Sequence, residues 1–186
     1  MNNKWFGEYF NLYQKVLFED SNTNMLIQLK DMLTEMQTAG KKAIVMGNGA
    51  SASIASHIST DLTKGAGIRT TNFNDANLIT ALGNDYGYEN WMAKALELYA
   101  DKGDIAILVS SSGTSQNVVN AAKVAKILGL KIVTLSGFSA NNALKMCGDL
   151  NLWVDSKAYN IIENVHMIWL TAVCDAIIGN AEYSVN

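Results

Sequence analysis

The order of apolar and polar positions divides the chain into a helical start and an alternating strand–helix remainder. Between Trp5 and Met36 the apolar residues recur at steps of three and four, interrupted by the polar segment EDSNTN, which predicts two amphipathic helices. After Lys42, short apolar runs end in small-residue turns that lead into helical patterns. The runs are AIVM, RTTNF, DIAILV, KIVTL and NLWV. This alternation predicts an α/β fold, a three-layer α/β/α sandwich around a five-stranded parallel sheet.

The helices that follow the strands are expected at 51–64, 76–100, 115–128, 141–147 and 159–179. With 186 residues and no internal repeat, linker or low-complexity stretch, the chain is expected to form one domain over 1–186. Within it, residues 1–38 form the N-terminal helical pair and residues 42–180 form the α/β core. A hydrophobic content of 49% is ordinary for a globular protein, whereas the mean hydropathy of +0.07 suggests apolar surface kept for contacts between subunits.

Charge and cysteine content narrow the class of protein. The net charge is −3 and no cluster of lysines and arginines occurs, so we expect neither nucleic acid nor an anionic membrane as a partner. Cys147 and Cys174 have no CxxC spacing and are expected to be reduced. The start of the chain lacks a signal-peptide pattern, and no run of about 18 apolar residues occurs. We therefore expect a cytoplasmic protein.

Two loops rich in glycine and hydroxyl residues follow the first and third predicted strands. They are GNGASAS (47–53) and SSSGTSQN (110–117), and each leads into a helix. Glycines allow close backbone approach, and free N–H groups at a helix start hold an anion, which predicts a phosphate site. The alternative is helix capping by serine, although one hydroxyl per loop would suffice for that. Neither loop matches a P-loop or a GxGxxG fingerprint, so no nucleotide is predicted.

Three further groups of polar residues allow a functional and a structural interpretation. His57 and Asp61 share one face of a predicted helix, either beside the phosphate site or as a local ion pair. Glu163 and His166 share a face of the last helix, where core packing is the alternative. In GNDYG, Asp85 either faces a ligand or caps the helix that follows the turn.

Together these motifs resemble the sugar isomerase (SIS) domain family, and within it the phosphoheptose isomerases. They are GNGAS, the His57–Asp61 helix, GNDYG, SSSGTS and the Glu163–His166 helix, so that the resemblance covers nearly the whole chain. It implies a flavodoxin-like five-stranded sandwich and a homotetramer with active sites at subunit junctions, in which the N-terminal helices pack between subunits. It also implies conversion of sedoheptulose 7-phosphate to D-glycero-D-manno-heptose 7-phosphate, through an enediolate, for lipopolysaccharide or capsule.

The same resemblance implies roles for individual residues. Asp61 is the expected general base and His166 the expected acid. His57 and Glu163 would orient sugar hydroxyls or, together with Asp61 and His166, hold a zinc ion. The residues expected to contact the phosphosugar are Asn48, Gly49, Ser51, Asp85, Ser110, Ser111, Ser112 and Ser115.

Two positions depart from the family pattern. Asp61 stands where the family has glutamate, so its carboxylate is one methylene shorter, and Thr171 replaces a second histidine that serves as acid or metal ligand in one branch. The second departure leaves open whether a zinc ion is bound. Three functions therefore remain: a phosphoheptose isomerase, an isomerase for another phosphosugar, and a non-catalytic module. Such a module would sense a sugar phosphate or bind a replication initiator as a scaffold.

Overall fold

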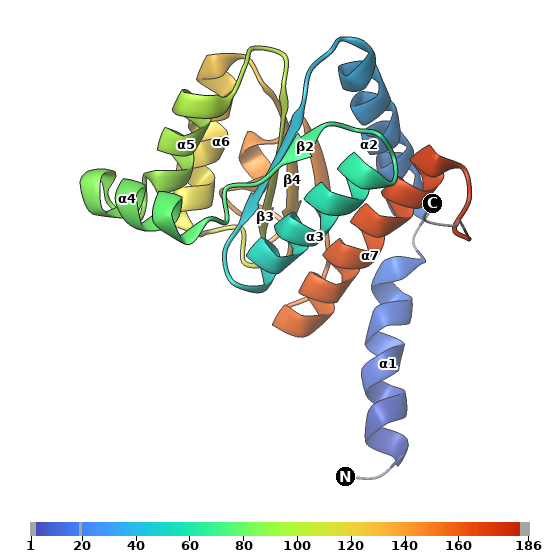
Figure 1. Cartoon of the computed structure of the whole chain (residues 1–186). Coiled ribbons are helices and arrows are strands. Elements are labelled where there is room, and N and C mark those ends of the chain that lie inside the picture. The colour runs from blue at the N-terminus through green and yellow to red at the C-terminus, as the bar shows by residue number, and fades with distance from the viewer. Residues whose placement is uncertain (1–2, 19, 183–186) are drawn as a thin grey trace.

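A parallel sheet of five strands forms the centre of the molecule (Figure 1). The computed structural model describes residues 3–18 and 20–182; residues 1–2, 19 and 183–186 of the predicted 1–186 domain lie outside the described part. The strand order is β2-β1-β3-β4-β5. The strands are β1 (Ala43–Gly47), β2 (Thr70–Thr71), β3 (Ile105–Ser110), β4 (Lys131–Ser136) and β5 (Leu150–Trp153). Every pairing between neighbours is parallel, which confirms the predicted sheet.

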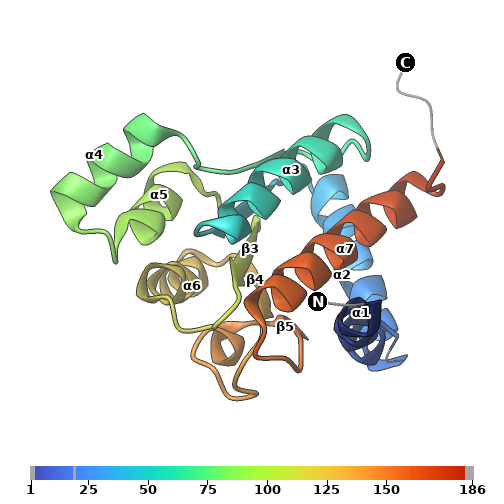
Figure 2. The same ribbon diagram turned by 90° about the horizontal axis from the view of Figure 1, so that it is seen from below.

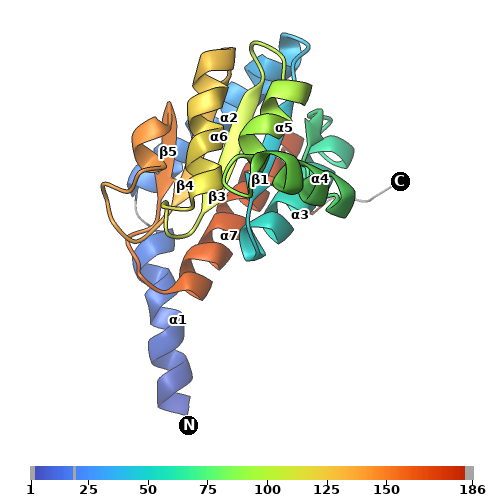
Figure 3. The ribbon, with the colours of Figure 1, turned by 90° about the vertical axis from the view of Figure 1, so that its left-hand side faces the viewer.

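Helices cover both faces of this sheet (Figure 2). On one side lie α2 (Asp20–Thr38), α3 (Ala50–Lys64) and α7 (Tyr159–Ile178), and on the other α4 (Ala76–Tyr86), α5 (Trp91–Tyr99) and α6 (Gln116–Leu128) (Figure 3). Successive side chains of a strand point to opposite faces. Ala43 and Val45 accordingly pack with α2, α3 and α7, whereas Ile44 and Met46 pack with α4, α5 and α6. The three-layer α/β/α sandwich is thereby confirmed.

Three local expectations differ from the structure. The run RTTNF gives only the two-residue strand β2, because the chain turns away toward Asp75, whose carboxylate accepts hydrogen bonds from the first N–H groups of α4. The predicted helix 76–100 is broken into α4 and α5 by Gly87, which has a φ of 83° that favours glycine. The predicted helix 141–147 is reduced to the 3-10 turn η1 (Lys145–Cys147).

Helix α1 (Asn3–Leu17) extends away from the body of the molecule (Figure 1). Tyr9 and Tyr13 pack against the core, and the hydroxyl of Tyr13 accepts a hydrogen bond from Asn164 on α7. Trp5, Phe6 and Phe10, in contrast, remain 45%, 52% and 60% exposed. The helix therefore contacts its own domain along one side and presents an aromatic surface on the other.

Helix α7 is long and apolar enough to cross a membrane by length and composition alone. It lies beside α3 and against α2, however, and buries eight side chains, among them Ile162, Val165 and Trp169. This packing is that of a core helix in a soluble domain, and it explains the high hydropathy of the segment.

Candidate functional site

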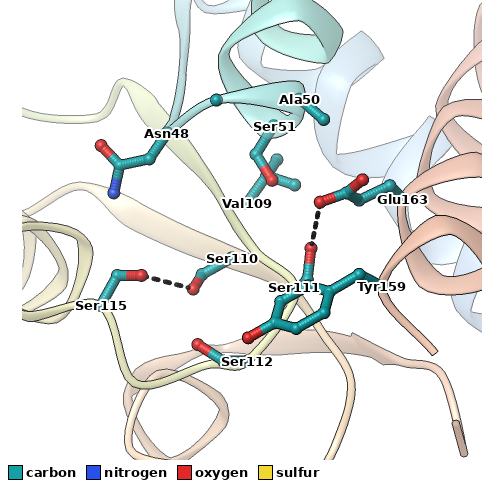
Figure 4. Close-up of a pocket in the computed structure, with 11 residues that line it drawn as sticks. Asn48, Ala50, Ser51, Val109, Ser110, Ser111, Ser112, Ser115, Tyr159 and Glu163 are labelled. Carbon is teal, nitrogen blue, oxygen red and sulfur yellow. Dashed lines mark hydrogen bonds between the residues drawn. The ribbon is translucent and has the colours of Figure 1, made fainter. Parts of the chain in front are cut away.

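The two glycine- and hydroxyl-rich loops meet at the carboxyl end of the sheet. Strands β1 and β3 are neighbours, with Gly47 paired to Val109, so the loops that follow them lie side by side. Between the loops and α7 lies an open cavity of about 260 Å³. Its lining residues are Asn48, Gly49, Ala50, Ser51, Val109, Ser110, Ser111, Ser112, Ser115, Tyr159 and Glu163 (Figure 4). Of the eight residues expected to contact the phosphosugar, only Asp85 lies outside this lining.

The loop after β1 needs glycine at two positions. Gly49 has a φ of 56° at the start of α3, a conformation that strains other residues. A Cβ atom on Gly47 would lie 2.5 Å from the Cβ of Ser51, so this glycine lets α3 pack directly on the end of β1. The first N–H groups of a helix have no partner within the helix. In α3, the N–H groups of Ser51 and Ala52 donate to the carbonyl oxygens of Asn48 and Gly49 at 3.0 Å, and this first turn lies at the wall of the cavity.

The hydroxyl groups of the second loop do not cap α6. Ser115 is the residue before this helix, but its side chain makes no capping hydrogen bond; its Oγ instead accepts from the Ser110 hydroxyl at 3.2 Å (Figure 4). The Ser112 oxygen accepts from the N–H and hydroxyl of Thr114 at 3.2 and 3.0 Å, which leaves its own O–H available to a ligand. Hydroxyls and N–H groups at two helix starts form a neutral cradle suited to a phosphate group. We call Ser51, Ser110, Ser112 and Ser115 the phosphate cradle.

A pair of amides joins the two loops. The side chains of Asn48 and Asn117 exchange two hydrogen bonds of 2.9 Å, and the Tyr88 hydroxyl donates to Asn48 at 3.1 Å. Asn48 thus fixes the spacing of the two loops as well as lining the cavity. The sequence did not single out Tyr88 or Asn117, although Asn117 belongs to the loop motif that predicted the site.

The first turn of α7 forms the opposite wall of the cavity. Glu163 accepts a hydrogen bond from the Ser111 hydroxyl at 3.1 Å, so Ser111 faces α7 rather than the cradle serines (Figure 4). Tyr159 also lines the cavity, and its ring packs on Phe138 with a centroid distance of 4.9 Å. Tyr159 was not predicted from the sequence, although it stands in the segment after β5, at the ligand-binding end of a parallel sheet.

His57 and Asp61 form an ion-pair contact farther along α3. His57 Nε2 lies 3.0 Å from Asp61 Oδ2, and the two side chains are 53% and 32% exposed. Neither residue lines the cavity. Asp61 follows Ser51 by ten residues, which places it about 15 Å farther along the helix axis. Within one chain, therefore, the predicted base and the phosphate cradle are well separated.

Asp85 lies on the exposed surface in the last turn of α4. Its carboxylate accepts a hydrogen bond from the neighbouring Asn84 amide at 2.9 Å. It does not cap α5, whose preceding residue is Asn90. The structural alternative for this motif was therefore wrong, and the role of Asp85 in substrate binding stays a prediction.

His166 is completely buried beneath the end of β4. Its Nε2 lies 3.2 Å from the carbonyl oxygen of Ser136, and its Nδ1 has no hydrogen-bond partner among the described residues. Burial lowers the pKa of the ring to about 4, and the contact with Ser136 opposes this shift only in part. The geometry gives no support to its predicted role as acid. Thr171, one turn later, donates its hydroxyl to backbone carbonyls of α7.

The four residues predicted to hold zinc do not come together within one chain. In the described ranges, no three histidine, cysteine, aspartate or glutamate side chains are grouped so that they could share a metal ion. His57 and Asp61 are paired, Glu163 is held by Ser111, and His166 is buried. The residues of a single chain therefore do not fit a zinc ion.

Comparison with known proteins agrees with the geometry. The model of the SIS domain family matches residues 5–137. The phosphoheptose isomerase of Aliarcobacter butzleri is 38% identical over 146 residues, 74% of this chain and 76% of that protein. That of Campylobacter concisus is 33% identical over 174 residues, 89% of this chain and 90% of that protein. The solved structure of a phosphoheptose isomerase from Francisella tularensis matches with a TM-score of 0.86 and 27% identity, covering 96% of this chain and 99% of that one. The resemblance is confirmed: the chain belongs to the SIS domain family, in its phosphoheptose isomerase branch.

Proposed function

We propose that the protein is an aldose–ketose isomerase that converts sedoheptulose 7-phosphate to D-glycero-D-manno-heptose 7-phosphate for a surface glycan. The observation that carries this proposal is the uncharged phosphate cradle at the carboxyl ends of β1 and β3, in a chain of the phosphoheptose isomerase branch. Serine hydroxyls and helix N-termini hold a phosphate dianion by donating hydrogen bonds. The sugar carbons would then extend from the cradle past Ser111 toward Glu163.

The reaction moves one proton between neighbouring carbons. A base removes a proton from C1 of the ketose, an enediolate forms, and the proton returns to C2 while a second proton moves between the two oxygens. Asp61 is the proposed base, and its contact with His57 holds the carboxylate in place. Glu163, with one oxygen on Ser111, is positioned to accept a hydrogen bond from a sugar hydroxyl. His166 takes no part in these transfers, because its ring is buried and bonded to Ser136.

The position of Asp61 favours a site that is shared between two chains. Asp61 lies about 15 Å farther along α3 than Ser51 and outside the cavity lining. The base would therefore act on a sugar held by the cradle of a neighbouring subunit. A homotetramer with composite sites provides this arrangement, and the exposed aromatic residues of α1 offer apolar surface for its assembly. A monomer mass in light scattering would contradict this part of the proposal.

Zinc stays a prediction for the assembled protein. One chain supplies His57 and Asp61 as a pair, so a complete set of ligands would have to include residues from another chain. Loss of turnover on addition of a chelator would show that the assembled protein needs the metal.

Turnover of sedoheptulose 7-phosphate tests the proposed activity. We expect the purified protein to produce the aldose phosphate, detected by chromatography, and to act less well on phosphorylated ketoses with fewer carbons. A parallel sample with a chelator shows whether a metal is needed. Tight binding of the sugar phosphate without any aldose product would contradict the isomerase and favour the non-catalytic sensor or scaffold.

A further inference from the structure

His166 is fully buried in the core and takes no part in the proposed proton transfers. A fully buried imidazole loses its hydration and is kept only where it makes a specific contact. The ring of His166 has no exposed surface and touches the end of β4, directly behind the loop that carries the cradle serines. Glu163 lies three residues earlier on the same helix, and its carboxylate contacts that loop from the cavity side. Helix α7 therefore contacts this region from two sides.

The end of β4 is bonded to the cradle loop. The N–H of Gly137, the residue after Ser136, donates to the carbonyl of Ser111 at 2.9 Å. The buried Asn142 side chain donates to the Ser136 hydroxyl at 2.9 Å and to the Gly137 carbonyl at 3.2 Å. A shift of the Ser136–Gly137 peptide would thus move the backbone of Ser111.

Close packing makes this connection stiff. A Cβ atom on Gly137 would lie 2.5 Å from the side chain of Ile162, so α7 rests directly on the β4 end. A Cβ atom on Gly113 would overlap the Asn142 amide, so the cradle loop rests on Asn142. The contacts form a closed circuit: from His166 to Ser136, through Gly137 to Ser111, and from Ser111 through its hydroxyl back to Glu163.

We propose that His166 is a positioning residue, whose neutral ring donates from Nε2 to the Ser136 carbonyl and thereby holds Ser111 and the cradle in register with Glu163. A carbonyl oxygen can only accept, so Nε2 carries the proton of the neutral ring and Nδ1 carries a lone pair. The same Ser136 oxygen accepts from the Val154 N–H at 2.9 Å, which ties β5 into the circuit. The kinetic part of this proposal rests on the proposed isomerase activity.

Two substitutions separate positioning from catalysis. Glutamine at position 166 can place an amide N–H near the place of Nε2, whereas leucine fills similar space without a donor. For His166→Leu we expect KM to rise about tenfold, the effect of one lost hydrogen bond, with kcat within about twofold of wild type. His166→Gln should recover most of that KM and leave the pH profile of kcat unchanged. Val173→Ala, a buried change on α7 two turns beyond His166, controls for loss of stability and should leave KM unaltered.

A loss of kcat of more than about 100-fold in His166→Gln, with unchanged KM, would overturn the proposal, because general acid catalysis contributes effects of that size. Nitrogen-15 NMR of the intact protein provides a measurement that needs neither turnover nor a stable leucine variant. The chain has two histidines, so the spectrum of His166→Gln assigns both rings. We expect His166 to remain the neutral Nε2–H tautomer from pH 5 to pH 8, with or without inorganic phosphate. A ring that gains a proton between pH 6 and pH 8 would contradict it. Since this readout does not depend on the reaction, it stands even if the isomerase assay fails.

Discussion

Replacing Asp61 by asparagine is expected to lower kcat for sedoheptulose 7-phosphate by roughly 10²–10⁴-fold, the range that general base catalysis contributes. Asparagine keeps the shape of the side chain and can still contact His57, but its amide cannot take a proton from C1. Because Asp61 does not line the cavity, binding of the sugar phosphate should persist, and a thermal shift with the substrate measures that. The variant thus separates binding from chemistry.

The matched control is Asp61→Glu, which restores the residue that the family resemblance places here. The longer side chain keeps the carboxylate and extends its reach by one methylene, so this variant should retain turnover. If Asp61→Asn kept more than a few per cent of wild-type activity, Asp61 would lose its role as base. If both variants lost activity equally, the position would be sensitive to shape rather than to proton transfer.

Replacing Ser112 and Ser115 together by alanine is expected to raise KM by at least roughly 100-fold. Hydrogen bonds to a charged group contribute about 1.5–3 kcal/mol each, and tenfold in affinity corresponds to about 1.4 kcal/mol. Neither hydroxyl caps α6 by its side chain, so the helix should remain folded without them. Steady-state kinetics across substrate concentrations measures the change, with circular dichroism to check the fold.

Ser53→Ala is the control for this pair, because Ser53 is an exposed serine on α3 that lies outside the cavity lining. It should leave KM unchanged. If KM were also unchanged in the double variant, the cradle would not be the phosphate site, and its hydroxyls would have only a structural role.

The fold could be predicted because each buried strand ends at a turn signal. Strands such as β1 and β3 are buried throughout, and a parallel sheet covered on both faces is the arrangement that buries them. GNDYG was recognised as a turn, yet the helix was expected to run from 76 to 100; the positive φ of Gly87 in this turn ends α4 and separates it from α5. The length of strand β2 was overestimated, because residues 72–75 form the turn into α4 and do not continue the sheet.

The candidate site could be predicted in part. The loops were identified because glycine and hydroxyl residues after a strand have few other uses, and the contact between His57 and Asp61 follows from their helical spacing. Tyr159 was missed because an aromatic residue at a helix start carries no motif. Ile162, Val165 and Trp169 surround His166 at helical spacing, and this pattern indicated that the histidine is buried. Spacing alone does not show that its ring contacts the Ser136 carbonyl.

The central claim is that turnover needs the cradle of one chain and the Asp61 carboxylate of another. Mixed oligomers test it most directly: Asp61→Asn chains are combined with Ser112→Ala/Ser115→Ala chains by co-expression, and sedoheptulose 7-phosphate turnover is compared with that of each parent. In a mixed assembly, some sites pair an intact cradle with an intact carboxylate from the neighbouring subunit. At a substrate concentration near the wild-type KM, where both parents turn over slowly, we therefore expect clearly more activity in the mixture than either parent shows. A mixture that contains both chains in one oligomer, yet is no more active than its parents at that concentration, would contradict the account.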